Sequence, residues 1–447
     1  MTGQRMGSEL LATSLRDPRR VALGLAVVTL VALAAALIRP SADVQLYERY
    51  AKDALTAPIA HRLPVEYPAL SAVIFVIAHL APMQYPLSFA LLMAIVLGGL
   101  VLAGRGLGAE PAWLGRLVWY LGLGTTTVLF SRYDLLPATA ALIAVLEARR
   151  HRWGTAWIAA VLGGALQLFP FLLLPGFLIA EWRETRRLPW SRMAISALSL
   201  AAVAGLQHAL APASVLSPVR YELRRGFEFS SLPGSLTLLG NLGQVRFRFG
   251  FGAWEIVGSG HTAIADVMGF LAIASIIGLW VAALRNRLEV GEVALAVLSV
   301  AVLTDRALAP QYLIWLAPLW ALWPLRRGWL ASAALTTLVY PVAFRLDPLL
   351  GSTMMLAAAM AIARNVVLLG ATLSWLRARL VEHRSAEPDE AESTVACAAR
   401  DTFLAGRRRE GAWGDEPVRE PWSTGAAALQ ASRCGIEGGG TSVLEGR

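Results

Sequence analysis

The sequence predicts an all-α integral membrane protein with about ten to twelve transmembrane or re-entrant helices. Of its 447 residues, 56% are hydrophobic and 16% are charged, and the mean hydropathy is +0.55. A soluble domain carries charge on about a quarter of its residues, so this composition indicates a chain that resides in lipid. The apolar residues occur in long runs that are separated by polar segments, and this pattern indicates membrane-spanning helices.

The apolar runs that predict spanning helices are distributed along most of the chain. They lie at about 21–38, 86–104, 113–130, 134–148, 193–212, 263–283, 288–304, 307–325, 328–344 and 350–376. Residues 69–81 are apolar but too short to span, and we interpret them as an interfacial helix. Residues 155–180 are broken at Pro170, and we interpret them as a bent hairpin that re-enters the membrane.

The distribution of basic residues predicts the orientation. Residues 1–20 and the apolar run that follows have the layout of a signal peptide, but the run is long and Arg39-Pro40 comes after it, so we expect a retained first helix. Arginine is denser in the segments expected inside, which places both termini in the cytoplasm if 155–180 returns to the side where it began. The predicted parts are a cytoplasmic N-terminus (1–20), a membrane domain (21–381) with outer loops 39–85 and 213–262, and a disordered cytoplasmic tail (382–447).

Charge and cysteine content exclude several function classes. The net charge of +9 comes from arginines in short loops beside apolar runs, as anionic lipid and insertion topology require, and nucleic acid is therefore not an expected partner. Lys52 is the only lysine, a bias typical of a GC-rich, bacterial genome. Cys397 and Cys434 both lie in the tail, which excludes zinc and thiol chemistry in the membrane part. We expect no metal and no cofactor.

The first outer loop carries the densest group of chemically able side chains. Asp43 follows the first apolar run, where a carboxylate at the water–lipid boundary can stay ionised and act as a general base; the alternative is an Asp that caps the next helix. Tyr47, Glu66 and Tyr67 in the same loop are candidate contacts for a sugar or an acceptor. The loop therefore predicts a reaction site held at a membrane surface.

Two further polar clusters lie at the same predicted face. Arg132 could bind a phosphate with its planar guanidinium while Asp134 orients it or caps the following helix, or the two side chains could simply pair. Arg306 is a second phosphate candidate, and Gln311 and Tyr312 could bind hydroxyl groups.

Three arginines of the second outer loop, Arg220, Arg224 and Arg225, could bind a lipid phosphate or rest among headgroups. Arg364 lies inside an apolar run, where a charge calls for a partner or a function, and we place it in the inner half of its helix.

The order of these motifs resembles that of the polyprenyl-phosphate-mannose-dependent glycosyltransferases, family eighty-seven of the GT-C class. The resemblance covers about residues 20 to 376 and departs from the family pattern at Ala69 and Gln167. The motifs that carry it are Asp43, Glu66-Tyr67-Pro68, Arg132-Tyr133-Asp134-Leu-Leu-Pro, 167–175 and Pro310-Gln311-Tyr312-Leu-Ile-Trp.

The resemblance implies a GT-C helical bundle in the plasma membrane with its site on the outer face. It implies an inverting transfer of a hexose, usually mannose, from a polyprenyl phosphate to a glycolipid or polysaccharide. Asp43 would be the general base, and Arg132 and Arg306 would offset the charge on the leaving phosphate. The alternatives are a transporter or flippase of polyprenyl-linked glycans, which should show charges along a path through the membrane and paired repeats, and a non-catalytic family member.

Overall fold

A computed structural model gives the fold of residues 15–38, 40–58, 62–211, 215–341 and 353–410. The chain divides into two units, Met1–Leu380 and Val381–Arg447. The predicted cytoplasmic segment up to residue 14, the end of the apolar run 328–344, the start of the run 350–376 and the tail beyond residue 410 lie outside the described residues.

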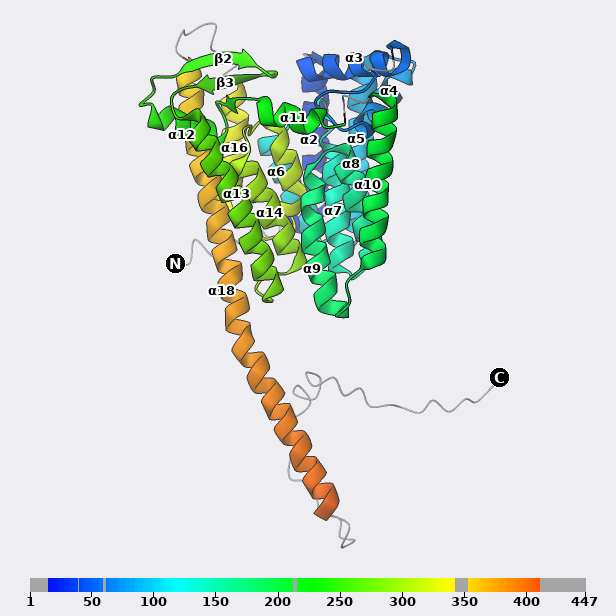
Figure 1. The fold of residues 1–447 in the computed structure, drawn as a ribbon, viewed down its shortest axis with the longest axis vertical. Coiled ribbons are helices and arrows are strands. Elements are labelled where there is room, and N and C mark those ends of the chain that lie inside the picture. The colour runs from blue at the N-terminus through cyan, green and yellow to red at the C-terminus, as the bar shows by residue number, and fades with distance from the viewer. Residues whose placement is uncertain (1–14, 39, 59–61, 212–214, 342–352, 411–447) are drawn as a thin grey trace, which may run out of the picture. The chain divides into compact units, whose positions relative to one another are not determined.

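Helices dominate the described chain (Figure 1). In sequence order they are α2 (Pro18–Ile38), α3 (Ala42–Thr56), α4 (Leu70–Leu80), α5 (Tyr85–Gly106), α6 (Trp113–Gly124), α7 (Leu135–Arg149), α8 (Trp153–Leu166), the 3-10 helix η2 (Phe169–Leu173), α9 (Leu174–Thr185), α10 (Trp190–Leu210), α11 (Ser217–Arg224), α12 (Leu232–Gly240), α13 (His261–Leu284), α14 (Val290–Thr304), α15 (Gln311–Trp320), α16 (Arg327–Pro341) and α18 (Thr353–Glu410).

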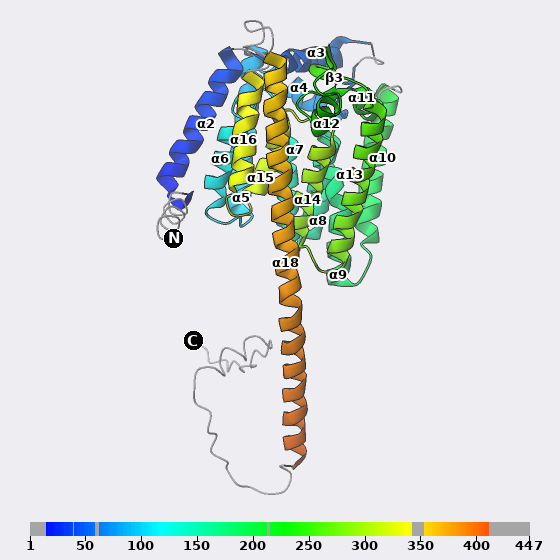
Figure 2. The same ribbon diagram turned by 90° about the vertical axis from the view of Figure 1, so that its left-hand side faces the viewer.

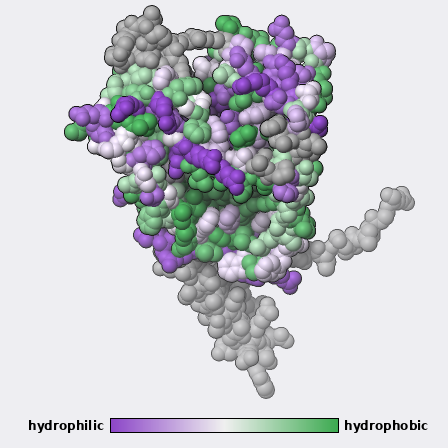
Figure 3. Space-filling view, turned by 45° about the horizontal axis from the view of Figure 1, so that its top comes forward, coloured by the Kyte–Doolittle hydropathy of each residue, from purple (hydrophilic) through white to green (hydrophobic). Residues whose placement is uncertain are grey.

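Four helices of the described chain are long and apolar enough to cross a membrane. They are α2, α5, α13 and the part of α18 from Met354 to Arg384. Several others are shorter: α6 has 12 residues and so extends over about 18 Å, against about 30 Å for a hydrocarbon core. Figure 3 shows hydrophilic side chains over the end that carries α3 and the sheet, with a largely hydrophobic side surface below it. This pattern is typical of a multi-pass membrane protein. The finer count of ten to twelve spans remains a prediction.

The segment 155–180 folds as a hairpin made of α8, η2 and α9. The Glu184 carboxylate at the end of α9 accepts hydrogen bonds from Trp153 Nε1 at the start of α8 and lies 2.8 Å from His151 Nδ1. The turn is tight, because a Cβ on Gly164 would lie 2.2 Å from the Phe171 ring. Both ends of the segment therefore lie at the same end of the bundle, as the predicted topology requires.

A small sheet departs from the all-α prediction. The loop 213–262 contains β1 (Phe227–Glu228), β2 (Arg246–Gly250) and β3 (Ala253–Val257) in the order β1-β3-β2, all antiparallel. The alternating sequence Arg-Phe-Arg-Phe of β2 has the period of a strand. The turn after β2 uses positive φ at Phe251 (50°) and Gly252 (72°), which closes a short hairpin.

Helix α4 corresponds to the predicted interfacial helix 69–81, but it is packed into the body of the protein. Phe75 and Ala78 on one face are buried in the main core, while Val73 and Ile77 on the other are half exposed. Its short apolar sequence was compatible with either arrangement, and the structure decides it, because Tyr47 and Tyr50 of α3 cover the Phe75 ring.

The helix α18 continues past the predicted membrane domain to Glu410. The low apolar content of 382–410 predicted a disordered tail, whereas these residues are helical in the structure. Low apolar content argues against a packed core and not against a single helix, and this stretch is rich in Ala, Glu and Arg, which favour helix.

Candidate active site

The polar loops of the bundle converge at one end, where α3 and α11 lie across the tops of the other helices (Figure 1). Asp43 at the start of α3 contacts Arg132, which lies between α6 and α7. Glu66, which follows α3, lies near enough to Tyr221 on α11 for each side chain to shift the pKa of the other, while the Tyr221 hydroxyl donates a hydrogen bond to the Phe251 carbonyl (3.0 Å). Residues from the predicted outer loops 39–85 and 213–262 are therefore neighbours, as a single site would require.

Asp43 and Arg132 form the central ion pair of this end. Asp43 Oδ2 lies 2.7 Å from Arg132 Nη2, and the two side chains are 26% and 19% exposed, so solvent or a substrate can reach both. The alternative role for Asp43 as a helix cap is filled by Ser41, whose Oγ accepts from the Val44 N–H. Asp43 is therefore free of that structural task.

Glu66 is a second carboxyl group at the ion pair. Burial raises the pKa of Glu66, and the nearby negative charge of Asp43 raises it further. The neighbouring Tyr221 side chain and the charges of Arg132 and Arg225 act in the opposite direction, lowering the pKa of Glu66. A carboxyl group whose pKa is raised holds its proton more strongly than an exposed one, which is a property of groups used in general acid–base chemistry.

Asp134 is enclosed below the ion pair and connects three elements. Its Oδ1 accepts hydrogen bonds from Trp315 Nε1 (2.7 Å) on α15 and from Gln167 Nε2 (3.1 Å) at the end of α8. Only 2% of Asp134 is exposed. Although Asp134 precedes α7, its side chain makes no capping hydrogen bond there. The contacts give it a positioning role beneath Arg132 and no route to a bound substrate.

Tyrosines from α3 and its flanking loop form an aromatic floor under the site. Tyr47 is fully buried and stacks on Phe75, with ring centroids 4.4 Å apart. Tyr67 meets Tyr133 edge to face at 5.2 Å. Tyr47 therefore packs in the core and cannot reach a sugar, whereas Tyr67 is partly exposed beside Glu66.

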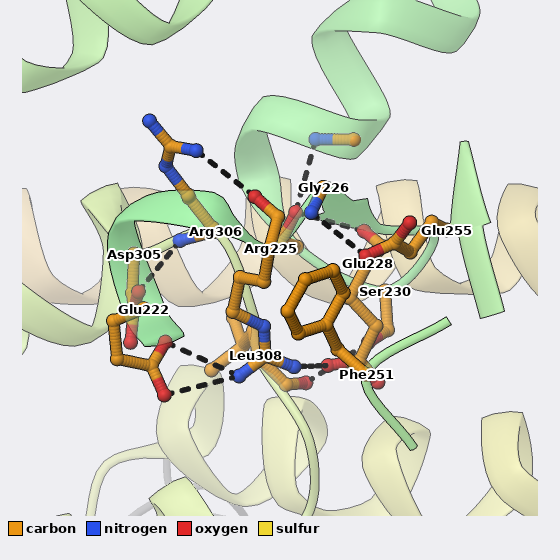
Figure 4. A network of polar contacts seen from close by, with 12 residues as sticks. Glu222, Arg225, Gly226, Glu228, Ser230, Phe251, Glu255, Asp305, Arg306 and Leu308 are labelled. Carbon is orange, nitrogen blue, oxygen red and sulfur yellow. Dashed lines mark hydrogen bonds and ion pairs between the residues drawn. The ribbon is translucent and has the colours of Figure 1, made fainter. Parts of the chain in front are cut away.

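Arg306, predicted to bind phosphate, is engaged with the backbone of α11. Its Nη1 donates to the carbonyl oxygens of Leu223 (2.8 Å) and Arg225 (2.9 Å), and its guanidinium lies over the Phe227 ring. Figure 4 shows this side chain reaching the Arg225 carbonyl. Cations favour the C-terminal end of a helix, where carbonyl groups lack partners. Arg306 therefore fixes the end of α11 over the site.

Arg225 lies closer to the site than its sequence context indicated. Its Nη1 is 3.3 Å from Glu222 Oε2, and its Nη2 is 4.0 Å from Glu228 Oε2 (Figure 4). Helical spacing carried the only signal in the sequence, since Tyr221 and Arg225 are four residues apart and so share a face of α11.

Asp305 and Tyr312 extend this network from the opposite side. Burial and the charge of Glu222 raise the pKa of Asp305 to about 7, and the Tyr312 hydroxyl donates a hydrogen bond to Asp305. Gln311 beside it is partly buried, and its Oε1 has no hydrogen-bond partner within the described part of the chain. Of the two hydroxyl-binding candidates, Gln311 thus retains a vacant acceptor and Tyr312 is occupied by Asp305.

Arg364 is fully buried within the apolar part of α18 (Met354–Arg384), about 15 Å along the helix from Met354, and its partners lie in segments predicted to be outer, which differs from its predicted place in the inner half. Its guanidinium donates to the carbonyls of Ser230 and Leu308 (2.9 Å), both in the outer segments, and its Nε donates to Asn365 Oδ1 (3.0 Å). The apolar run of 350–376 did not indicate how deep in the membrane Arg364 lies. Only the segments that contain Ser230 and Leu308, which pack against the helix, distinguish its two ends.

Comparison of the chain with protein-family models, curated proteins and solved structures finds no match. Within the described ranges, no group of three or more His, Cys, Asp or Glu side chains is placed to hold a metal ion.

Proposed function

We propose that the protein is an inverting membrane glycosyltransferase that moves a hexose from a polyprenyl phosphate to a glycolipid or polysaccharide on the outer face of the plasma membrane. By the family resemblance the hexose is mannose and the fold is of the GT-C type. The observation that carries the proposal is the contact between Asp43 and Arg132 at the end of the bundle where the polar loops meet. A base and a phosphate-binding cation are the two groups that such a transfer needs.

In the proposed reaction the acceptor oxygen attacks the anomeric carbon while the bond from that carbon to the phosphate oxygen breaks. The acceptor proton passes to the Asp43 carboxylate, and the bond electrons leave with the polyprenyl phosphate. A guanidinium has five N–H donors, so Arg132 can contact Asp43 and still offer hydrogen bonds to the phosphate. Those hydrogen bonds stabilise the charge that develops on the leaving group.

Two further observations support this proposal. Glu66 lies near enough to Asp43 for the charge of Asp43 to raise its pKa, which adds a second carboxyl group beside the proposed base. The long apolar surface of α2, including Leu30 at 65% and Ile38 at 83% exposure, leads from the lipid to Ser41 and the ion pair. A lipid-linked donor could therefore approach Arg132 without leaving the membrane.

The test measures transfer from radiolabelled polyprenyl-phosphate-mannose in membranes that contain the wild type or a variant. D43N should lower the rate by about 10²–10⁴-fold, the usual contribution of a general base. E48Q is the matched control, because Glu48 lies on the same helix and pairs with Lys52 (2.6 Å) away from Arg132. R132K keeps the charge but loses the fork, so it should raise the KM for the donor.

Equal transfer by wild type and D43N would remove Asp43 from the mechanism, and the same assay on E66Q would then identify the base. Movement of the intact lipid-linked sugar across the membrane, without transfer to an acceptor by any variant, would favour the transporter.

A further inference from the structure

A cavity lies between α16 and α18 at the end of the bundle away from Asp43. It has a volume of about 350 Å³ and is lined by Arg326, Arg327, Gly328, Gly370, Ala371 and Ser374. Figure 2 shows α16 and α18 side by side, and a Cβ on Gly328 would lie 2.6 Å from Ala371 Cβ. The two helices thus touch at the edge of the cavity, which fixes its shape.

The cavity holds positive charge without a carboxylate in contact. Neither Arg326 nor Arg327 makes an ion pair with an acidic side chain in the described part of the chain, and the Arg326 Nε–H is buried without an acceptor there. Burial lowers the pKa of Arg326, and the charge of Arg379 lowers it further. Arg379 is itself paired with Glu292 (4.0 Å), so among the described side chains the unused Arg326 donor is the group left to bind an added anion.

The depth of the cavity corresponds to a headgroup layer. Met354 at the start of the apolar part of α18 packs with Phe229 and Ile256 at the outer end. At about 1.5 Å per residue, Ser374 lies about 30 Å further along the helix. A bilayer hydrocarbon core is about 30 Å thick, so the cavity opens where the phosphates of the opposite leaflet lie.

We propose that this cavity binds the headgroup of an anionic phospholipid of the leaflet opposite the active site. The phosphate would accept hydrogen bonds from Arg326 and Arg327, and the acyl chains would run along the exposed face of α18 that carries Val366 (61% exposed) and Leu373 (55%). The lining is partly apolar, since it includes Val367 as well as Ser374. It therefore suits an amphiphilic molecule, with a charged headgroup and acyl chains, better than it suits free phosphate.

The test is native mass spectrometry of the detergent-solubilised full chain with phosphatidylglycerol, phosphatidylcholine or inorganic phosphate added. The wild type should retain phosphatidylglycerol in preference to phosphatidylcholine. R326Q/R327Q should weaken that binding by about tenfold or more, as expected for the loss of charge-assisted hydrogen bonds. R285Q is the matched control, since Arg285 is exposed at the same end, in the connection between α13 and α14, and lies outside the cavity.

A second variant separates binding from folding. A Cβ on Gly370 would meet nothing within 4 Å, so G370L should fill the cavity while keeping both arginines and the helix. We expect G370L to lose phosphatidylglycerol as R326Q/R327Q does, with an unchanged unfolding midpoint in lipid-free detergent. Retention of the lipid by both variants, equal binding of phosphatidylcholine, equal loss in R285Q, or occupancy by inorganic phosphate instead of lipid would each overturn the proposal.

Discussion

Replacement of Arg364 by methionine tests whether this buried guanidinium holds the outer segments on the bundle. Methionine keeps most of the side-chain length and removes the charge and all donors. Arg364 binds the carbonyls of Ser230 and Leu308 and the side chain of Asn365, so the variant breaks contacts among three separate segments. The expected effect is a loss of stability together with a looser outer loop.

The magnitude follows from which partners stay satisfied. The Ser230 carbonyl keeps a hydrogen bond from Asn365 Nδ2 (3.1 Å), and the Leu308 carbonyl keeps a longer one from Ser230 Oγ (3.3 Å). Asn365 Oδ1 loses its donor, which costs about 1–3 kcal/mol for a buried acceptor. Glu228, which is 3% exposed, also loses a nearby positive charge. We therefore expect R364M to lower the free energy of unfolding by about 2–5 kcal/mol.

The assay is unfolding in mild detergent by titration with a denaturing one, followed by tryptophan fluorescence, since the chain has 15 tryptophans. R377M is the control, because Arg377 is an exposed arginine on the same helix. A double variant with E228Q removes the opposing buried charge and should be more stable than the sum of the single effects predicts.

A free energy of unfolding for R364M equal to that of R377M would refute the structural role of Arg364. Strict additivity of R364M and E228Q would show that hydrogen bonds alone, without the charge of Glu228, explain the loss.

Three further predictions concern the same end of the protein. Burial and the charge of Glu222 raise the pKa of Asp305 to about 7, whereas an Asp in an unfolded chain has a pKa of about 3.9. Between these two pH values the folded state binds one proton more than the unfolded state. The free energy of unfolding should therefore fall as the pH rises from about 4 to about 7. Thermal midpoints across this range should show that slope in wild type and not in D305N; a slope that persists in D305N would assign it to another group. R306K removes the guanidinium that donates hydrogen bonds to two carbonyl groups at the end of α11, so it should destabilise α11 locally by about 1–2 kcal/mol. The measurement is amide hydrogen exchange over Ser217–Arg224, which should become faster. Unchanged exchange would contradict this role of Arg306. Tyr221 lowers the pKa of Glu66, so Y221F should raise that pKa and move the pH profile of transfer to higher pH; an identical profile would separate Glu66 from the reaction.

The sequence alone indicates a multi-pass membrane protein, because the hydropathy of a segment depends only on the residues in that segment and not on the fold. The apolar runs at 21–38, 86–104 and 263–283 correspond to α2, α5 and α13 within a few residues. Pro170 indicated where the segment 155–180 turns, because proline lacks the N–H of a helical hydrogen bond whatever the surrounding fold is. Asp43 and Arg132 were also candidates from the sequence, because each lies in a polar segment next to an apolar run, and that placement can be seen without the fold.

The tertiary structure alone decided how these residues pair. Asp43 and Arg132 lie far apart in the chain, and only the packing of α3 on the bundle brings their side chains to 2.7 Å. The tertiary packing also brings the Arg306 guanidinium to the carbonyl groups at the end of α11. It likewise buries Asp134, which accepts a hydrogen bond from Trp315. Composition and spacing specify which groups can bind or react. Which group faces which is fixed by contacts between distant segments, because each side chain binds the partner that the fold places within hydrogen-bond reach.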